Sequence, residues 1–280
     1  MNHTHDEIRT AVRKQYGQIA RSEVAGCCSP STTGTGCCGP NANASLALGY
    51  SSEELAVVPE GANMGLGCGN PQAIAALQEG ETVLDLGSGG GFDSFLSARQ
   101  VGPTGYVIGV DMTPDMVSKA RANAASLGAT NVEFRLGEIE TLPVADDTVD
   151  VILSNCVVNL SPDKSAVFRE AFRVLKPGGR LAISDVVATA ALPDAFATDL
   201  AAYTGCVSGA EHYTTIEQLL ADAGFDDIRV GVKAESGEFI RDWIPGSRVE
   251  DYVASATIEA LKPGGSACCG SSCCEADHPA

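Results

Sequence analysis

Apolar strand segments and helical segments alternate regularly between residues 76 and 190. Five short runs rich in Val, Ile and Leu have the length and composition of buried strands, at 82–86, 106–110, 132–136, 149–153 and 180–184. Helical patterns lie between them, at 92–101, 114–127 and 163–175. Helical crossovers return each strand parallel to its predecessor. The sequence therefore predicts an α/β fold with a doubly wound, mostly parallel sheet.

Local signals mark the expected ends of these helices. Residues 113–115 and 161–163 read Thr-Pro-Asp and Ser-Pro-Asp, so each offers an N-cap hydroxyl, a proline for the first turn and an acid behind it. We therefore expect Thr113 and Ser161 to cap the second and third helices. The run Leu-Lys-Pro-Gly-Gly at 175–179 is expected to end the third helix, because proline and glycine stop helices.

Composition divides the 280 residues into four parts. A chain of this length can bury the core of one large domain and carry an appendage. The predicted parts are an N-terminal segment with a Cys-rich loop (1–75), the α/β core (76–190), a C-terminal α+β lobe for the substrate (191–262) and a flexible Cys-rich tail (263–280).

The balance of charge restricts the partners. The chain holds 18 Lys and Arg against 36 Asp and Glu, so its formal net charge is −18, and no block of basic residues occurs. The electrostatic field of this negative charge repels phosphate groups, so we expect neither nucleic acid nor membrane as a partner. The first 22 residues lack the apolar run of a signal peptide, and no stretch approaches the roughly 18 apolar residues of a membrane span. We expect a cytoplasmic protein, and a monomer.

A glycine-rich turn follows the first predicted strand. Asp85 lies at the end of this strand in VLDLGSGGGFD, and the glycines after it include Gly87, Gly89 and Gly91. At the carboxyl ends of strands in open α/β sheets, glycines let the backbone approach a ligand. A dinucleotide fingerprint needs a small residue where this chain has Phe92. The pattern D-x-G-x-G-x-G instead resembles the S-adenosylmethionine (SAM) loop of class I methyltransferases, although a plain tight turn also uses glycines.

Further strand ends supply candidates for the same ligand. Asp111 ends the second strand, where a carboxylate can accept two ribose hydroxyls or simply serve as an acid at a helix N-terminus. The other candidates are Met112 to cover the adenine, Glu138 and Ile139 to meet its edge and face, and Asn155 to contact the methionine moiety. Met112 could equally be a packing residue, and Asn155 could satisfy backbone groups. As a set, these motifs resemble a Rossmann-like class I methyltransferase, which implies SAM as the cofactor.

The chain contains 11 cysteines, which is an odd number. Eight form adjacent pairs, at 27/28, 37/38, 268/269 and 273/274, and three stand alone: Cys68, Cys156 and Cys206. Secreted disulfide scaffolds are small, so reduced thiols that bind a soft ion or carry out redox work fit this chain better. A single cysteine is most often a small buried hydrophobe. Three cysteines in polar, Gly-flanked loops together predict a set of thiol ligands for a soft ion.

Several motifs resemble those of bacterial arsenite methyltransferases: EGANMGLGCGNP, VLDLGSGGGFD, GVDMTPDM, GEIETLPV, SNCVVNLSPDK and TGCVSGA. The resemblance implies that SAM methylates trivalent arsenic stepwise, to mono-, di- and sometimes trimethyl forms. It also implies that Cys68, Cys156 and Cys206 bind the arsenic, and that thioredoxin or glutathione reduces oxidised cysteines. The family uses one more N-terminal cysteine, for which Cys27, Cys28, Cys37 and Cys38 are all candidates.

Two other functions are also compatible with the sequence. Quinone- or sterol-type C-methyltransferases share much of the core pattern, and in such an enzyme the cysteines would be incidental. A non-enzymatic protein that sequesters metalloids on a methyltransferase fold is the second alternative. The intact Asp85, Gly87, Gly89 and Asp111 argue against the latter. Amine methylation through an Asn/Asp-Pro-Pro-Tyr motif is disfavoured, because that position holds Asn-Cys-Val-Val.

Overall fold

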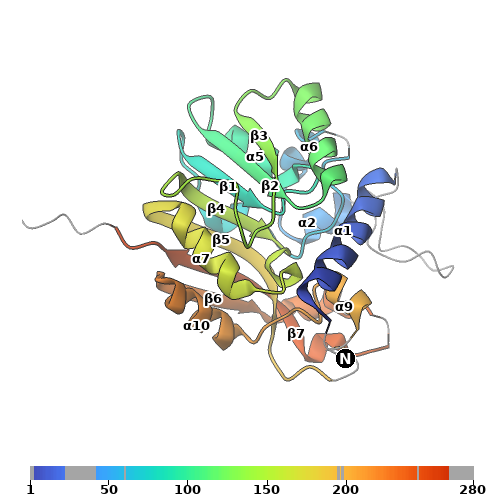
Figure 1. Ribbon diagram of the computed structural model, residues 1–280. Helices are drawn as coiled ribbons and strands as arrows, with labels where there is room; N and C mark the ends of the chain where they lie inside the picture. Colours follow the sequence, from blue (N-terminus) through green and yellow to red (C-terminus); the bar gives the residue numbers. More distant parts are fainter. Residues whose placement is uncertain are drawn as a thin grey trace, which may run out of the picture.

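The computed structural model describes residues 3–22, 42–59, 61–193, 196, 199–244 and 246–264, and Figure 1 shows their arrangement. The strands are β1 (Thr82–Leu86), β2 (Tyr106–Asp111), β3 (Val132–Leu136), β4 (Val149–Asn155), β5 (Leu175–Ala188), β6 (Asp226–Lys233) and β7 (Val253–Leu261). The longer helices are α1 (His5–Arg21), α5 (Phe92–Gln100), α6 (Pro114–Leu127), α7 (Lys164–Val174) and α10 (Tyr213–Ala223). The short helices are α2 (Ala42–Ala47), α3 (Ser52–Ala56), α4 (Gln72–Ala75), η1 (Val158–Leu160), α9 (Leu200–Thr204), η2 (Ala234–Ser236), α11 (Gly237–Ile240) and η3 (Val249–Asp251).

Seven strands of the described chain form one mixed sheet in the order β3-β2-β1-β4-β5-β7-β6. The first five strands in sequence pair in parallel, whereas β7 pairs antiparallel with both β5 and β6. The strand order reverses between β1 and β4, which is where open α/β sheets bind ligands. The predicted α/β fold is confirmed.

Both faces of the sheet are covered at β1, where successive side chains point to opposite faces and are buried on each. Leu84 of β1 belongs to the cluster that packs against α7 and α10. Its neighbour Val83 faces the other way and joins the cluster beneath α4, α5 and α6. This two-sided burial explains why the strands read as continuous apolar runs in the sequence.

The predicted strands and helices of the core are present in the structure, but the expected end signals at residue 113 and at residues 161–179 differ from it. Asp163 caps α7 by accepting a hydrogen bond from the Ala166 N–H at 2.9 Å, so the expectation that Ser161 would be the N-cap is wrong. The Ser161 hydroxyl instead donates to Glu140 at 2.8 Å. Residue 113 does precede α6, but its side chain makes no capping hydrogen bond. The run 175–179 follows the end of α7 and already belongs to β5, because Leu175 pairs with the start of β4.

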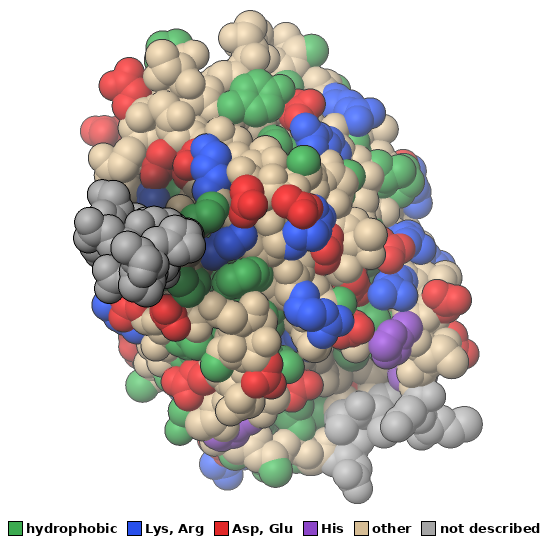
Figure 2. Space-filling model, turned by 60° about the vertical axis from the view of Figure 1, so that its left-hand side comes forward, with side chains coloured by type: hydrophobic (Ala, Val, Ile, Leu, Met, Phe, Trp, Pro, Cys, Tyr) green, Lys and Arg blue, Asp and Glu red, His purple; other side chains and the backbone are tan. Residues whose placement is uncertain are grey.

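The predicted C-terminal lobe is continuous with the core, since its strands β6 and β7 extend the same sheet. The division into domains at residues 75, 190 and 262 stays a prediction, and the cysteines of the predicted tail lie outside the described residues. No helix in the described part combines the length and apolar character that a membrane span requires. On the face shown in Figure 2, acidic and basic side chains lie interspersed rather than in separate patches.

Helix α1 lies across the carboxyl ends of the strands, against α6 and α9 (Figure 1). A capping box begins it, in which the Thr4 side chain and Glu7 exchange hydrogen bonds with each other's backbone N–H. Ile8 and Val12 face inward and are buried. The helix therefore covers the edge of the sheet at which a ligand is expected.

Candidate active site

A cavity lies between α1 and the carboxyl ends of β1, β2 and β4. Eight of the predicted site residues line it: Asp85, Gly87, Gly89, Asp111, Met112, Ile139, Asn155 and Cys156. Gly91, Glu138, Cys68 and Cys206 lie outside this lining. Strand ends that are distant in the sequence thus converge on one cavity, as the pattern of motifs predicts.

The glycine-rich turn forms a close cradle on one side of the cavity. Gly87 has a φ of +68°, and a Cβ there would lie 2.3 Å from a methyl carbon of Val157. Gly91 precedes α5 with a φ of +93°, which favours glycine for the same backbone reason. Between them, the Ser88 hydroxyl is buried and has no hydrogen-bond partner among the described residues. An unsatisfied buried hydroxyl at a cavity wall fits a polar ligand.

Acidic side chains surround the same turn. Asp111 accepts hydrogen bonds from the N–H groups of Gly89 at 3.0 Å and Thr113 at 2.8 Å, so it joins the glycine-rich turn to the start of α6. Burial raises the pKa of Asp111. Burial and the neighbouring Asp93 raise the pKa of Asp85 well above its usual range. This concentration of carboxyl groups suits a ligand with positive charge.

A buried polar network beneath the turn was not anticipated from the sequence. Asp93 accepts from the Tyr50 hydroxyl at 2.7 Å and from the Asn155 side-chain amide at 3.3 Å, and Gln72 donates to its backbone oxygen at 2.9 Å. Asp93 belongs to the VLDLGSGGGFD motif, but Tyr50 and Gln72 come from segments without any recognisable signal. The network joins the glycine-rich turn to the end of β4.

Helix α1 contributes Arg9, Val12 and Tyr16 to the cavity, none of which was predicted. Arg9 forms ion pairs with Glu138 at 3.3 Å and with Glu140 at 3.1 Å. Glu140 lines the cavity, whereas Glu138 turns toward Arg9 and Arg13 on α1 and its side chain is 35% exposed. The assignment of Glu138 to the adenine edge stays a prediction, and Glu140 is a second candidate for a polar contact.

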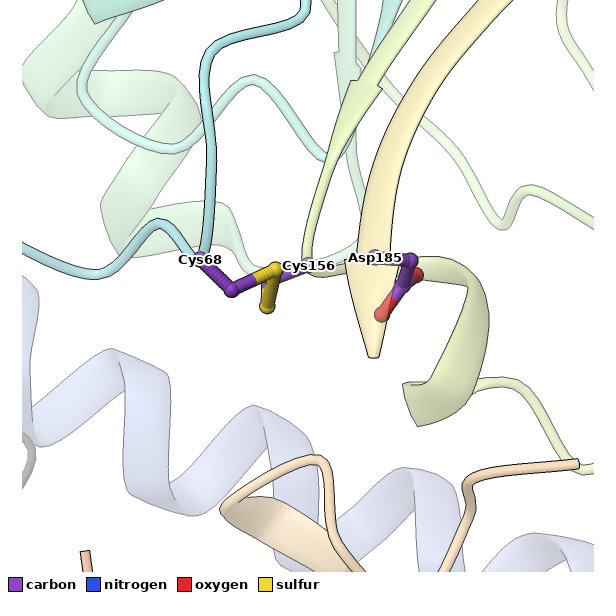
Figure 3. A group of neighbouring side chains, drawn as sticks. All are labelled: Cys68, Cys156 and Asp185. Atoms are coloured by element: carbon purple, nitrogen blue, oxygen red, sulfur yellow. A yellow bond between two sulfur atoms is a disulfide. The ribbon is translucent and has the colours of Figure 1, made fainter. Parts of the chain in front are cut away.

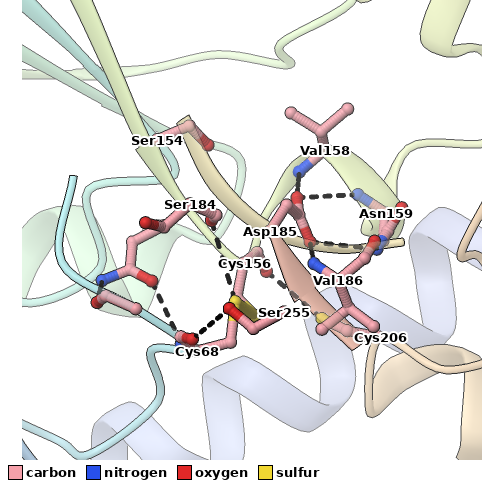
Figure 4. The surroundings of a disulfide bond; sticks show 12 residues. Cys68, Ser154, Cys156, Val158, Asn159, Ser184, Asp185, Val186, Cys206 and Ser255 are labelled. Carbon is pink, nitrogen blue, oxygen red and sulfur yellow. Dashed lines mark hydrogen bonds between the residues drawn. A yellow bond between two sulfur atoms is a disulfide. The ribbon is translucent and has the colours of Figure 1, made fainter. Parts of the chain in front are cut away.

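The three solitary cysteines lie close together, as Figure 4 shows, and Cys156 lines the cavity. Cys68 and Cys156 form a disulfide with Cα atoms 5.8 Å apart. The Cys206 thiol donates to the backbone oxygen of Cys156 at 3.2 Å. All three are buried, with exposures of 1%, 6% and 5%. Cys156 and Cys206 both have positive φ, of +59° and +65°, a strained backbone conformation that concentrates at functional sites.

A carboxylate lies next to this cysteine group. A ligand atom of Asp185 lies within 4.8 Å of both Sγ atoms of Cys68 and Cys156. Figure 3 shows the Asp185 side chain beside the disulfide. The Asp185 carboxylate accepts from the N–H groups of Val158 at 2.9 Å and Val186 at 2.7 Å, and from the Asn159 side chain at 2.9 Å. Its oxygen atoms are therefore occupied in bracing the loop after Cys156.

Comparison with known proteins agrees with this geometry. A family described as "Methyltransferase domain" matches residues 77–224. An arsenite methyltransferase from Halobacterium salinarum is 53% identical over 271 residues, which cover 92% of this chain and 67% of that protein. The chain belongs to the arsenite methyltransferase family.

Other arsenite methyltransferases match shorter stretches. The protein from Aquipseudomonas alcaligenes is 46% identical over 181 residues, covering 62% of this chain and 52% of its own length. The human protein is 39% identical over 152 residues, covering 51% and 40%. The crystal structure of an arsenic (III) S-adenosylmethionine methyltransferase from Chlamydomonas reinhardtii matches with a TM-score of 0.60 and 33% identity, covering 79% of this chain and 74% of that one. The N-terminal cysteine candidates for this family, Cys27, Cys28, Cys37 and Cys38, lie outside the described residues.

Proposed function

We propose that this protein methylates trivalent arsenic with SAM as the methyl donor, converting arsenite to mono- and dimethyl products and sometimes to a trimethyl product. The observation that carries the proposal is the position of Cys68, Cys156 and Cys206. They form one group, and Cys156 also belongs to the wall of the cofactor cavity. Trivalent arsenic binds thiolates strongly and keeps a lone pair, so this arrangement presents a nucleophile where the cofactor would bind.

The cavity residues suit SAM by their chemistry. Asp111 would accept the ribose hydroxyls, Met112 and Ile139 would cover the adenine, and the turn from Gly87 to Gly91 would admit the methionine moiety, with the Ser88 hydroxyl as a further polar contact. When bound, SAM supplies an electrophilic methyl group on a positively charged sulfur. The carboxyl groups of Asp85, Asp93 and Asp111 would favour that charge.

The cysteines would hold the substrate. Three thiols displace three hydroxyl groups of arsenite as water, and the arsenic then has three bonds to sulfur. The site is buried and is covered by α1, so water is excluded and alignment can supply several kcal/mol of barrier reduction. Little acid–base chemistry is needed, because the arsenic lone pair is the nucleophile.

The disulfide between Cys68 and Cys156 must be reduced before arsenic can bind. Two electrons and two protons from an external dithiol or from two monothiols convert it to two protein thiols, and the reductant leaves as a disulfide. We propose glutathione or thioredoxin for this role. A site that works only with reduced thiols suits a reducing compartment such as the cytosol.

Arsenic speciation tests the proposal directly. The purified full-length protein is incubated with SAM, glutathione and arsenite, and the products are separated and quantified. Methylated arsenicals that depend on both SAM and the reductant are expected. Transfer to a quinone-like acceptor without any methylation of arsenite would support a C-methyltransferase instead. Tight arsenite binding without SAM turnover would support a sequestering protein.

A further inference from the structure

The Cys68 backbone is held by side chains of distant strands. The Cys68 N–H donates to the side-chain oxygen of Asn155 at 3.1 Å. The Ser255 hydroxyl donates to the Cys68 carbonyl at 2.8 Å, as Figure 4 shows. The Asn155 amide nitrogen donates to the carbonyl of Gly69 at 2.9 Å. Two side chains, from β4 and β7, therefore hold both backbone groups of Cys68 and the carbonyl that follows.

The segment around Cys68 has no regular structure of its own. Residues 63–70 make no backbone–backbone hydrogen bond to any other residue that the structure describes. The glycines that flank Cys68 let it lie close to its supports. A Cβ at Gly67 would be 2.7 Å from the Asn155 nitrogen, and one at Gly69 would be 2.7 Å from the Ser184 hydroxyl. Side-chain hydrogen bonds and close packing thus determine the position of this segment.

None of these bonds uses a sulfur atom of the disulfide. Asn155 directly precedes Cys156 in the sequence, so the residue that anchors Cys68 also carries its sulfur partner. Ser255 is buried and its N–H donates to the Ser236 hydroxyl at 2.9 Å, so its hydroxyl is aimed from a fixed backbone. Breaking the S–S bond removes no donor or acceptor of these backbone hydrogen bonds.

We propose that Asn155 and Ser255 are positioning residues that keep the Cys68 thiol beside Cys156 in the reduced protein. The proposal rests on the proposed function in that two adjacent thiols serve to bind one arsenic atom. It differs from the sequence-based assignment of Asn155 to the cofactor, because the side-chain oxygen of Asn155 is directed to Cys68. Ser255 lies outside the cavity lining, so it acts on the thiol pair alone.

The test measures the effective concentration of the Cys68 and Cys156 thiols for each other, which follows from the equilibrium of their disulfide with glutathione. The full-length protein is equilibrated in mixtures of reduced and oxidised glutathione and quenched with acid. Peptide mass spectrometry then quantifies the Cys68–Cys156 disulfide, so the other cysteines do not interfere. Ser255→Ala loses one buried hydrogen bond to Cys68 and should lower the effective concentration about tenfold. Asn155→Ala loses two bonds to this segment, to Cys68 and to Gly69, and should lower it by about tenfold or more. The affinity for SAM should be unchanged in Ser255→Ala.

Asn70→Ala is the matched control. Asn70 is a buried amide in the same segment, and it bonds to the backbone of Gly49 and Ala73 but not to Cys68. In Asn70→Ala, the effective concentration of the two thiols should stay within about twofold of the parent value, since no hydrogen bond to Cys68 is lost. Values for Asn155→Ala and Ser255→Ala equal to that of Asn70→Ala would overturn the proposal. Weakened SAM binding in Asn155→Ala with an unchanged thiol equilibrium would also overturn it, and would return Asn155 to the cofactor. Arsenic methylation is not measured, so this result is independent of the proposed activity.

Discussion

Replacing Gly87 with alanine tests whether the glycine-rich turn and the loop after Cys156 are packed as one unit. Two costs add in this variant. A Cβ in the left-handed region costs about 1–2 kcal/mol. The new methyl would also lie 2.3 Å and 2.5 Å from the two methyl carbons of Val157, the residue that follows Cys156. Overpacking of this kind costs about 1–3 kcal/mol, so we expect a total loss of about 2–5 kcal/mol in the free energy of unfolding.

Gly128→Ala separates the two costs. Gly128 ends α6 with a φ of +64°, close to the +68° of Gly87, but a Cβ there would meet nothing within 4 Å. It should show only the backbone cost of about 1–2 kcal/mol. The entropy that alanine removes from the unfolded chain is common to both variants and cancels in their difference. The extra cost at Gly87 therefore measures its collision with Val157.

Urea unfolding of the single variants and of Gly87→Ala/Val157→Ala provides the measurement. Removing the Val157 methyl groups should recover most of the overpacking cost, which would appear as a favourable coupling energy in the double-mutant cycle. SAM titration should show weaker binding for Gly87→Ala and recovery in the double variant. Equal stability losses in Gly87→Ala and Gly128→Ala would refute the claim that the two loops are packed together.

Three further predictions concern the cofactor, the buried acid and the substrate. Asp111→Ala should weaken SAM binding roughly tenfold to hundredfold, because a charged hydrogen-bond acceptor is lost, and an unchanged affinity by calorimetry would contradict the ribose assignment. Burial raises the pKa of Asp185 to about 6, so its contribution to stability is complete below the ordinary pKa near 3.8 and is lost as the pH rises through 6. Between pH 4 and 7, the unfolding free energy of the parent should thus fall by about 2 kcal/mol more than that of Asp185→Asn, whereas parallel curves would exclude this effect. Trivalent arsenic that already carries one methyl group, as in monomethylarsonous acid, has two bonds left for sulfur, so Cys68→Ser should lose methylation of arsenite but keep that of monomethylarsonous acid. Cys156→Ser and Cys206→Ser should lose both, and arsenite activity in Cys156→Ser, measured by speciation, would break the assignment.

Sequence alone determined the architecture of the core and most of the cofactor turn. Periodic apolar segments predicted β1, β3 and α6 with the bounds that the structure has. These features are encoded locally, because a strand buried on both faces needs a continuous apolar run and a crossover helix needs an amphipathic one. The positions of Asp85, Gly87 and Asp111 at strand ends follow from the same local logic, since the carboxyl ends of parallel strands meet at one edge.

Tertiary structure alone decided how the distant parts complete the site. No local pattern shows that Arg9 of α1 would reach Glu140, 131 positions away, or that Asn155 would anchor Cys68 across 87 positions. The sequence likewise does not show that the Ser161 hydroxyl would bind Glu140 while Asp163 caps α7. The sequence predicted that three cysteines would share one site, but only the fold placed Asp185 and Ser255 beside them. Periodicity reports which face of an element is buried, whereas the pairing of buried polar groups depends on which elements pack together in space.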